Sequence, residues 1–180
     1  MEFHDVDIFS VCVYNTSEIV DFHETERCNM TISFIGHSVI SSQSKVKEMV
    51  KEQIRGKITN GKLVCYLGGY GDFDEICACA CRELKQEYDG IELVYVTPYL
   101  SLSEQEKIKE LLNCGLYDTT VYPPIEKVPP KFAISKRNEW MMTNADTIIA
   151  YVNHSYGGAY KSLRVAKRRK KKIINICDFL

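Results

Sequence analysis

The sequence predicts an α/β protein in which helices cover both faces of a mostly parallel sheet, as a three-layer sandwich. From Met30 onward, short apolar runs alternate with stretches that carry apolar residues at helical spacing. Two of the runs are followed by glycine turns that lead from a strand to a helix. Strands that alternate with helices build a parallel sheet, which is buried on both faces.

The chain of 180 residues, 45% hydrophobic and 26% charged, has the length and composition of one globular domain. Its first 29 residues do not follow the alternation, because a strand-like pattern precedes a polar stretch without a helical stripe. The strand-like residues are Val6, Ile8, Val11 and Val13. We therefore divide the chain into an N-terminal extension, residues 1–29, and an α/β domain, residues 30–180.

Two strand-turn-helix units open the α/β domain. The first consists of a strand over 31–35, a turn over 36–38 and a helix over 44–54. The second consists of a strand over 62–67, the turn Gly68-Gly69-Tyr70-Gly71 and a helix over 72–87. A third strand over 91–96 precedes Ser103, where a Ser-x-x-Glu capping box predicts a helix over 103–112.

Residues 114–132 contain four of the five prolines, so we expect a long irregular loop with at most a short strand near 119–122. The remaining elements are a helix over 135–143, a strand over 146–152, a helix over 162–172 and a buried last strand over 173–177.

Composition excludes several classes of protein. The formal net charge of −1 and a pI near 6.4 give no overall attraction to nucleic acid or to an anionic membrane. No apolar run approaches the roughly 20 residues of a transmembrane helix, and the N-terminus lacks the basic region of a signal peptide. We therefore expect a cytoplasmic protein without a membrane partner, whose cysteines are reduced thiols. Cys77, Cys79 and Cys81 alternate along a predicted helix, which favours packing against the sheet over zinc binding.

The glycine turn after the second strand is the first candidate for chemistry. Glycines let a ligand approach the main chain, and the N-terminus of the following helix attracts anions such as phosphate. The pattern GGxGxxD matches neither the dinucleotide fingerprint nor a Walker A loop. A tight turn without any ligand is the alternative interpretation.

Other candidate groups follow the remaining strands, whose carboxyl ends should meet at one edge of the sheet. Gly36-His37-Ser38 follows the first strand, Thr97 follows the third, and Gly157-Gly158 follows the strand over 146–152. Arg137, just before that strand, can pair with a phosphate or carboxylate, although a solvated surface arginine is the alternative.

Histidines and tyrosines also fall on these loops. His37 and His154 can hydrogen-bond a ligand or act as acid or base, but a capping or solvated histidine is an equal alternative. Tyrosines near the glycines can stack on a base: Tyr70, Tyr156 and Tyr160. We interpret the basic run over 167–172 as a helix C-terminus whose cations oppose the helix dipole.

The order and spacing of five segments resemble the SLOG superfamily, a Rossmann-like group. It includes YpsA-related proteins, DNA-processing protein A and the phosphoribohydrolases often labelled lysine decarboxylase-like. The resemblance spans about residues 30–176. The segments are Ile35-Gly36-His37-Ser38, Gly68-Gly69-Tyr70-Gly71-x-x-Asp74, Lys136-Arg137-Asn138-x-x-Met141, Ala145-Asp146 with Ile148-Ile149-Ala150-Tyr151-Val152, and Gly157-Gly158-Ala159-Tyr160-Lys161-Ser162-Leu163.

The resemblance implies a nucleotide or nucleotide-derived ligand, with phosphate on the glycine turns and Arg137 near the ribose phosphate. No cofactor and no metal are expected, and a homo-oligomer is compatible with the sequence. The ligand-binding residues that we expect are Gly36, His37, Ser38, Gly68, Gly69, Tyr70, Gly71, Asp74, Thr97, Arg137, Asn138, Gly157, Gly158, Ala159 and Lys161.

One departure from the family pattern bears on catalysis. The phosphoribohydrolases read PGGxGTxxE with a catalytic glutamate. In this chain Tyr156 stands at the proline position, Tyr160-Lys161 replaces Gly-Thr, and the glutamate position falls near Leu163-Arg164. Without that carboxylate we expect binding or sensing rather than hydrolysis.

Two alternatives stay open. One is a phosphoribohydrolase-like enzyme that cleaves the N-glycosidic bond of nucleoside monophosphates and uses Asp72, Asp74 or Glu75 instead. The other is single-stranded DNA binding with help from the basic run over 167–172. The near-zero net charge argues against nucleic acid as a partner.

Overall fold

The computed structural model describes residues 29–59 and 61–179; the predicted N-terminal extension lies outside this range except for Asn29. The elements are β1 (Met30–Gly36), α1 (Gln43–Arg55), β2 (Leu63–Leu67), α2 (Asp72–Glu87), β3 (Ile91–Val96), α3 (Leu102–Asn113), β4 (Thr119–Val121), α4 (Pro130–Asn144), β5 (Thr147–Tyr151), α5 (Gly157–Arg168), β6 (Lys172–Asn175) and the 3-10 helix η1 (Ile176–Phe179).

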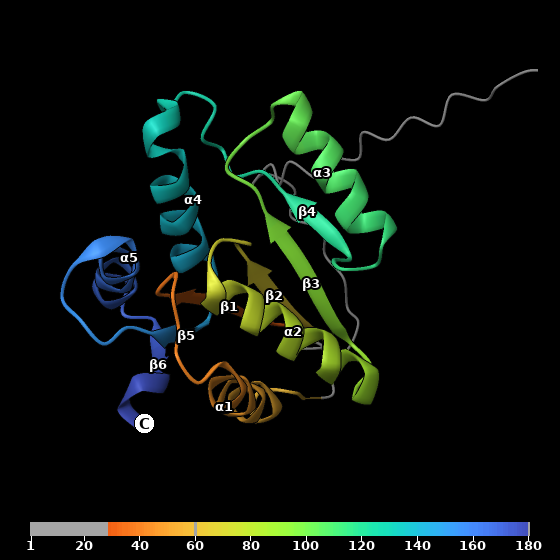
Figure 1. Cartoon of the computed structure of the whole chain (residues 1–180), viewed down its shortest axis with the longest axis vertical. Coiled ribbons are helices and arrows are strands. Elements are labelled where there is room, and N and C mark those ends of the chain that lie inside the picture. Colours follow the sequence, from red (N-terminus) through yellow and green to blue (C-terminus); the bar gives the residue numbers. More distant parts are fainter. Residues whose placement is uncertain (1–28, 60, 180) are drawn as a thin grey trace, which may run out of the picture.

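The strands form a single sheet in the order β4-β3-β2-β1-β5-β6, and every neighbouring pair is parallel. Helices α1 and α2 cover one face of this sheet, while α4 and α5 cover the other (Figure 1). The predicted Rossmann-like three-layer sandwich is therefore confirmed, and the sheet is entirely parallel within the described range.

The core lies in two hydrophobic clusters, one on each face of the sheet. Alternate residues of a strand point to opposite faces, so Ile32 and Phe34 of β1 join the cluster under α1 and α2. Ile35 joins the cluster under α4 and α5. Because both faces are covered, the open positions for a ligand are the loops at the strand ends.

Several element boundaries differ from the prediction. Helix α4 begins at Pro130 rather than at residue 135, because proline is well tolerated at the first helical position. Helix α5 begins at Gly157 rather than at residue 162, so the second glycine pair lies inside its first turn. Helix α3 is capped by Ser101, whose hydroxyl accepts the N–H of Glu104 at 3.3 Å, and not by Ser103.

The last strand also differs. β6 ends at Asn175 and lies at the edge of the sheet, so it is half-buried rather than buried. The basic run is divided between elements. Lys167 and Arg168 form the last turn of α5, but the helix ends at Arg168 rather than at residue 172, and Lys172 begins β6. None of the described helices is long and apolar enough to cross a membrane.

Candidate functional site

The candidate site lies where the strand order reverses. β1 pairs with β2 on one side and with β5 on the other. The loop after β1 leads to α1 on one face and the loop after β5 leads to α5 on the opposite face, which opens a crevice between them. A cavity of about 590 Å³ occupies this crevice and has the size of a small-molecule site.

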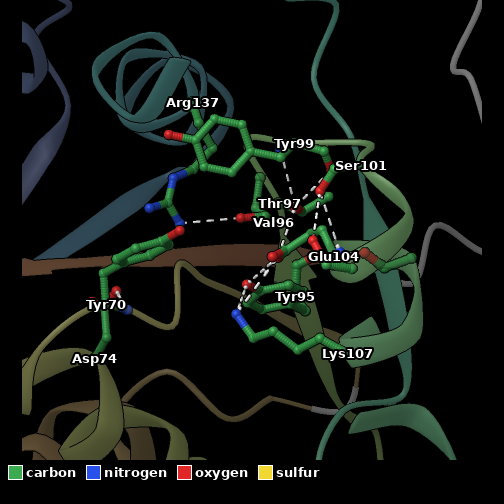
Figure 2. A network of polar contacts seen from close by, with 12 residues as sticks. Tyr70, Asp74, Tyr95, Val96, Thr97, Tyr99, Ser101, Glu104, Lys107 and Arg137 are labelled. Carbon is green, nitrogen blue, oxygen red and sulfur yellow. Dashed lines mark hydrogen bonds and ion pairs between the residues drawn. The ribbon is translucent and has the colours of Figure 1, made fainter. Parts of the chain in front are cut away.

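Arg137 of α4 forms part of the cavity wall although it is only 1% exposed. Its Nη1 donates to the carbonyl oxygen of Val96 at 3.1 Å, and its guanidinium lies 5.3 Å from the centre of the Tyr70 ring. Figure 2 shows the side chain reaching from α4 toward Tyr70. Arg137 Nε is buried without a hydrogen-bond partner among the described residues. A buried cation with an unpaired donor is an unusual feature in a folded protein.

Asp74, in the first turn of α2, also lines the cavity and is buried. Its Oδ2 accepts the N–H of Tyr70 at 2.9 Å. Burial raises the pKa of Asp74 from 3.8 to about 6, while the Tyr70 N–H and the charge of Arg137 oppose this rise. At pH 7 the carboxylate is therefore mostly ionised, and it offsets the charge of Arg137 at the floor of the cavity.

In the glycine turn between β2 and α2, other atoms of the protein fill the space beside the glycines. A Cβ at Gly68 would lie 2.1 Å from Arg137 Nη1, one at Gly69 would lie 2.7 Å from Tyr95 Cε2, and one at Gly71 would lie 2.7 Å from Ser38 Cα. Gly69 and Gly71 also have positive φ angles of 70° and 84°. Two N–H groups of the turn are already bonded, that of Tyr70 to Asp74 and that of Asp72 to the Ser38 carbonyl oxygen. Close packing therefore accounts for the glycines of this turn without a bound ligand.

The N-terminus of α5 differs from that of α2. The first turn of α2 holds three acidic residues, whereas that of α5 holds none. Among the described residues, neither helix has a side-chain cap at its start. A Cβ added at Gly158 would meet no protein atom within 4 Å, although Gly158 lines the cavity. Unpaired N–H groups and the positive end of the helix dipole therefore face open space, as an anion site requires.

Three aromatic side chains line the same cavity: His37, His154 and Tyr156. His37 Nε2 accepts the N–H of Asn153 at 3.1 Å, which links the loop after β1 to the loop after β5. Burial and the charge of His154 lower the pKa of His37, so His37 is neutral at pH 7. Nδ1 of His154 is buried and has no partner within the described chain.

Thr97 belongs to a polar network beside the site rather than to the cavity wall (Figure 2). Its hydroxyl lies 3.1 Å from both the Tyr99 carbonyl oxygen and Glu104 Oε1. Glu104 also accepts the Tyr95 hydroxyl at 2.8 Å, and that hydroxyl accepts Lys107 Nζ at 2.8 Å. This network fixes the end of β3 to the start of α3, which gives Thr97 a structural role.

The cavity brings together most, but not all, of the predicted ligand-binding residues. Those that line it are Gly36, His37, Ser38, Tyr70, Asp74, Arg137, Asn138, Gly157, Gly158 and Ala159. Those that do not line it are Gly68, Gly69, Gly71, Thr97 and Lys161. Cavity residues that our list of expected ligand-binding residues did not include are Phe34, Ile35, Val39, Ser41, Ile134, Met141, Tyr151, Asn153, His154 and Tyr156. The sequence had indicated His154 and Tyr156 as groups that can contact a ligand, because they stand in the loop after β5 beside the glycine pair, but the list of expected binding residues left them out.

The three carboxylates considered as replacements for the missing glutamate have different surroundings. Only Asp74 lines the cavity. Asp72 accepts the N–H of Ile40 at 2.9 Å and so holds the loop before α1, and Glu75 is exposed. At the glutamate position itself, Leu163 is buried in the core and Arg164 is exposed, so neither supplies an acid.

No protein-family model and no curated protein matches the sequence. Two solved structures share the fold. DNA processing protein A from Helicobacter pylori, which binds single-stranded DNA, has a TM-score of 0.53 and 14% identity over 80% of this chain and 63% of that chain. DNA processing protein A from Streptococcus pneumoniae has a TM-score of 0.55 and 13% identity over 80% of this chain and 49% of that chain. This chain thus spans 63% and 49% of their lengths, and the likeness establishes the fold.

Proposed function

We propose that this protein binds a nucleotide or nucleotide-derived small molecule in the cavity between β1 and β5, as a binding or sensing protein of the SLOG type. The observation that carries the proposal is the N-terminus of α5, which has no side-chain cap among the described residues and opens into a cavity whose wall also includes buried Arg137. The N–H groups of the helix start are donors, and phosphate is an acceptor with several oxygens.

The charges indicate where the phosphate lies. At the floor of the cavity, the Asp74 carboxylate would repel a phosphate at neutral pH. The first turn of α2 is acidic and would also repel it. The start of α5 has no acidic residue, and Lys161 and Arg164 follow on the same helix. The phosphate therefore belongs at Gly157-Gly158, and the Asp74–Arg137 pair is left for the neutral polar groups of the ligand.

The missing carboxylate supports binding over hydrolysis. Asp74 is the one carboxylate of the three considered that lies in the cavity wall, and it already accepts a main-chain N–H. We expect no release of free base from AMP at an ordinary enzymatic rate, about 1 per second or more. If release is seen, Asp74→Asn should abolish it and Glu75→Gln, an exposed position, should not.

Gly158→Val provides the direct test of the phosphate position. The added side chain meets no protein atom at Cβ, so the fold should persist while phosphate is blocked. Loss of one charge-assisted hydrogen bond weakens binding by about ten- to a hundredfold. Mass spectrometry identifies the small molecule that co-purifies with the protein. Calorimetry then measures the affinity of each variant for that molecule.

Gly56→Val is the matched control, because a Cβ at Gly56, the C-cap of α1, also makes only ordinary contacts, at 3.7 Å. It should leave the affinity unchanged. Equal affinities of Gly158→Val and the wild type would place the phosphate elsewhere.

Single-stranded DNA binding is the second candidate function, and the Helicobacter pylori neighbour favours it over our expectation from net charge. One local feature of the sequence is compatible with DNA binding. Between Asp146 and Asp178 the chain carries no acidic residue and eight basic ones: Lys161, Arg164, Lys167, Arg168, Arg169, Lys170, Lys171 and Lys172. If this segment binds DNA, affinity for an oligothymidylate should fall steeply with salt, and Lys170→Ala should reduce the slope of log K against log salt by about 0.7. If the segment is only a helix end, Lys170→Ala should change nucleotide affinity by less than about threefold.

A further inference from the structure

Three aromatic rings form a column at the cavity. The rings of His37 and His154 are stacked with centroids 3.8 Å apart and planes 18° apart. The rings of His154 and Tyr156 are stacked with centroids 3.9 Å apart and planes 15° apart. Two rings cannot occupy the same face of His154, so His154 lies between His37 and Tyr156.

The two ends of the column differ. At the inner end, the edge of His37 meets the ring of Tyr151 at 6.3 Å and 87°. At the outer end, Tyr156 is 72% exposed, and no further ring stacks on it among the described residues. Tyr156 nevertheless lines the cavity, together with Val39, which is 80% exposed. One face of a tyrosine ring is thus left in water beside the cavity.

The column is held in place before any ligand arrives. His37 is bonded to the N–H of Asn153, and His154 is held between two rings. His37 is neutral at pH 7, so charge repulsion does not separate the two histidines. An aromatic surface that is already ordered loses little entropy when another ring stacks on it.

We propose that the outer face of Tyr156 stacks on a planar ring of the ligand, so that the site takes nucleotides with a purine or pyrimidine base in preference to base-free sugar phosphates. This inference rests on the proposed function, because the phosphate at α5 places the rest of the ligand beside Tyr156, the residue immediately before Gly157. Stacking recognises any base by its π-face, so the inference specifies an aromatic group rather than one base.

The test compares each of AMP, GMP, CMP and UMP with ribose 5-phosphate, which has the same phosphate and sugar but no base. Calorimetry is done on the wild type, Tyr156→Ala and Tyr156→Phe. Tyr88→Ala is the matched control, since Tyr88 is also partly exposed but lies at the C-cap of α2 and not in the cavity.

The wild type should bind at least one of the nucleotides about ten- to a hundredfold more tightly than ribose 5-phosphate. Tyr156→Ala should lose this preference while its affinity for ribose 5-phosphate stays within about threefold of the wild type. Tyr156→Phe and Tyr88→Ala should keep the preference. Equal binding of all probes by the wild type, or an unchanged preference in Tyr156→Ala, would overturn the stacking inference alone. Failure of the wild type to bind any of the probes would overturn the proposed function as well.

Discussion

Arg137 is both a packing residue and a cavity residue. Its guanidinium contacts the Gly68 turn, bonds to the end of β3 and faces the ring of Tyr70. Burial lowers the pKa of Arg137, and the charge of Asp74 opposes this effect. Arginine nevertheless stays protonated, so the positive charge is permanent.

Arg137→Ala should therefore reduce stability as well as ligand affinity. The change removes the hydrogen bond to Val96 and leaves Asp74 buried without a cation, which should cost about 2–3 kcal/mol of unfolding free energy. Urea denaturation measures this cost. Lys136→Ala is the control, because Lys136 is exposed and forms only a surface ion pair with Glu139, so it should cost less than about 1 kcal/mol. Equal stabilities of Arg137→Ala and the wild type would mean that Arg137 does not hold the strand ends.

Asp74 should give the protein a distinctive pH dependence. Because burial raises its pKa from 3.8 to about 6, the folded state binds a proton more tightly than the unfolded state. Stability should therefore fall as pH rises from about 4 to about 6, by at most about 3 kcal/mol. Asp74→Asn cannot ionise, so its melting temperature should stay flatter across this range.

The stability contribution of Glu83 should depend on pH in the opposite direction. Hydrogen bonds from Lys47 and then Lys51 lower its pKa from 4.5 to about 2. Its contribution is present above about pH 4.5 and is lost as pH falls toward 2. Glu83→Gln should therefore melt at a lower temperature than the wild type above about pH 4.5, and the difference should disappear as pH falls toward 2. The Asp74→Asn difference, in contrast, should develop between about pH 4 and pH 6. Identical pH profiles for the two variants would contradict both assignments.

At the scale of elements, the start of α3 shows how two equivalent sequence signals are separated by structure. Ser101 and Ser103 both stand near the helix start, and Glu104 and Glu106 follow each at the spacing of a capping box. The structure selects Ser101. Its partner Glu104 does not complete the box but turns to Tyr95 and Thr97, which fixes the helix against β3.

Ser101→Ala should destabilise the protein by about 1 kcal/mol, the usual cost of losing an N-cap side chain. Ser103→Ala should cost less than about 0.5 kcal/mol, because Ser103 lies inside the helix and, within the described part of the chain, its hydroxyl is hydrogen-bonded only to that of Ser101. Unfolding in urea measures both. A larger loss of stability for Ser103→Ala than for Ser101→Ala would show that Ser103, not Ser101, caps the helix.

At the scale of the whole molecule, the described residues contain a complete sheet and both hydrophobic clusters. β1 begins at Met30 and is paired on both sides, with β2 and β5. Among the described residues, the members of the two clusters run from Met30 to Cys177. We predict that this part folds without a strand from residues 1–29.

A chain of residues 30–180 should therefore unfold in one cooperative transition. Scanning calorimetry of this chain and of the full-length protein gives the comparison. Aggregation of the shorter chain, or loss of its transition, would show that residues 1–29 supply part of the core.

The sequence by itself determined the alternation of strands and helices, the parallel sheet, and two elements to the residue, α2 and β3. These features depend on local periodicity and on glycine turns, which are visible over a few neighbouring residues. The predicted helix boundaries were wrong where a local signal was ambiguous, as at the prolines before α4 and the glycines at the start of α5.

Only the tertiary structure decided which loops meet. His37 and Asn153 are 116 residues apart in the chain, and their hydrogen bond exists because β5 inserts beside β1. The same strand order buries Arg137 under Gly68 and leaves Thr97 and Lys161 outside the cavity wall. Two glycine turns that look alike in sequence thus differ in role: that of Gly69 is filled by Tyr95, and that of Gly158 is open. The reason is physical, since the space beside a glycine is set by side chains from distant parts of the chain.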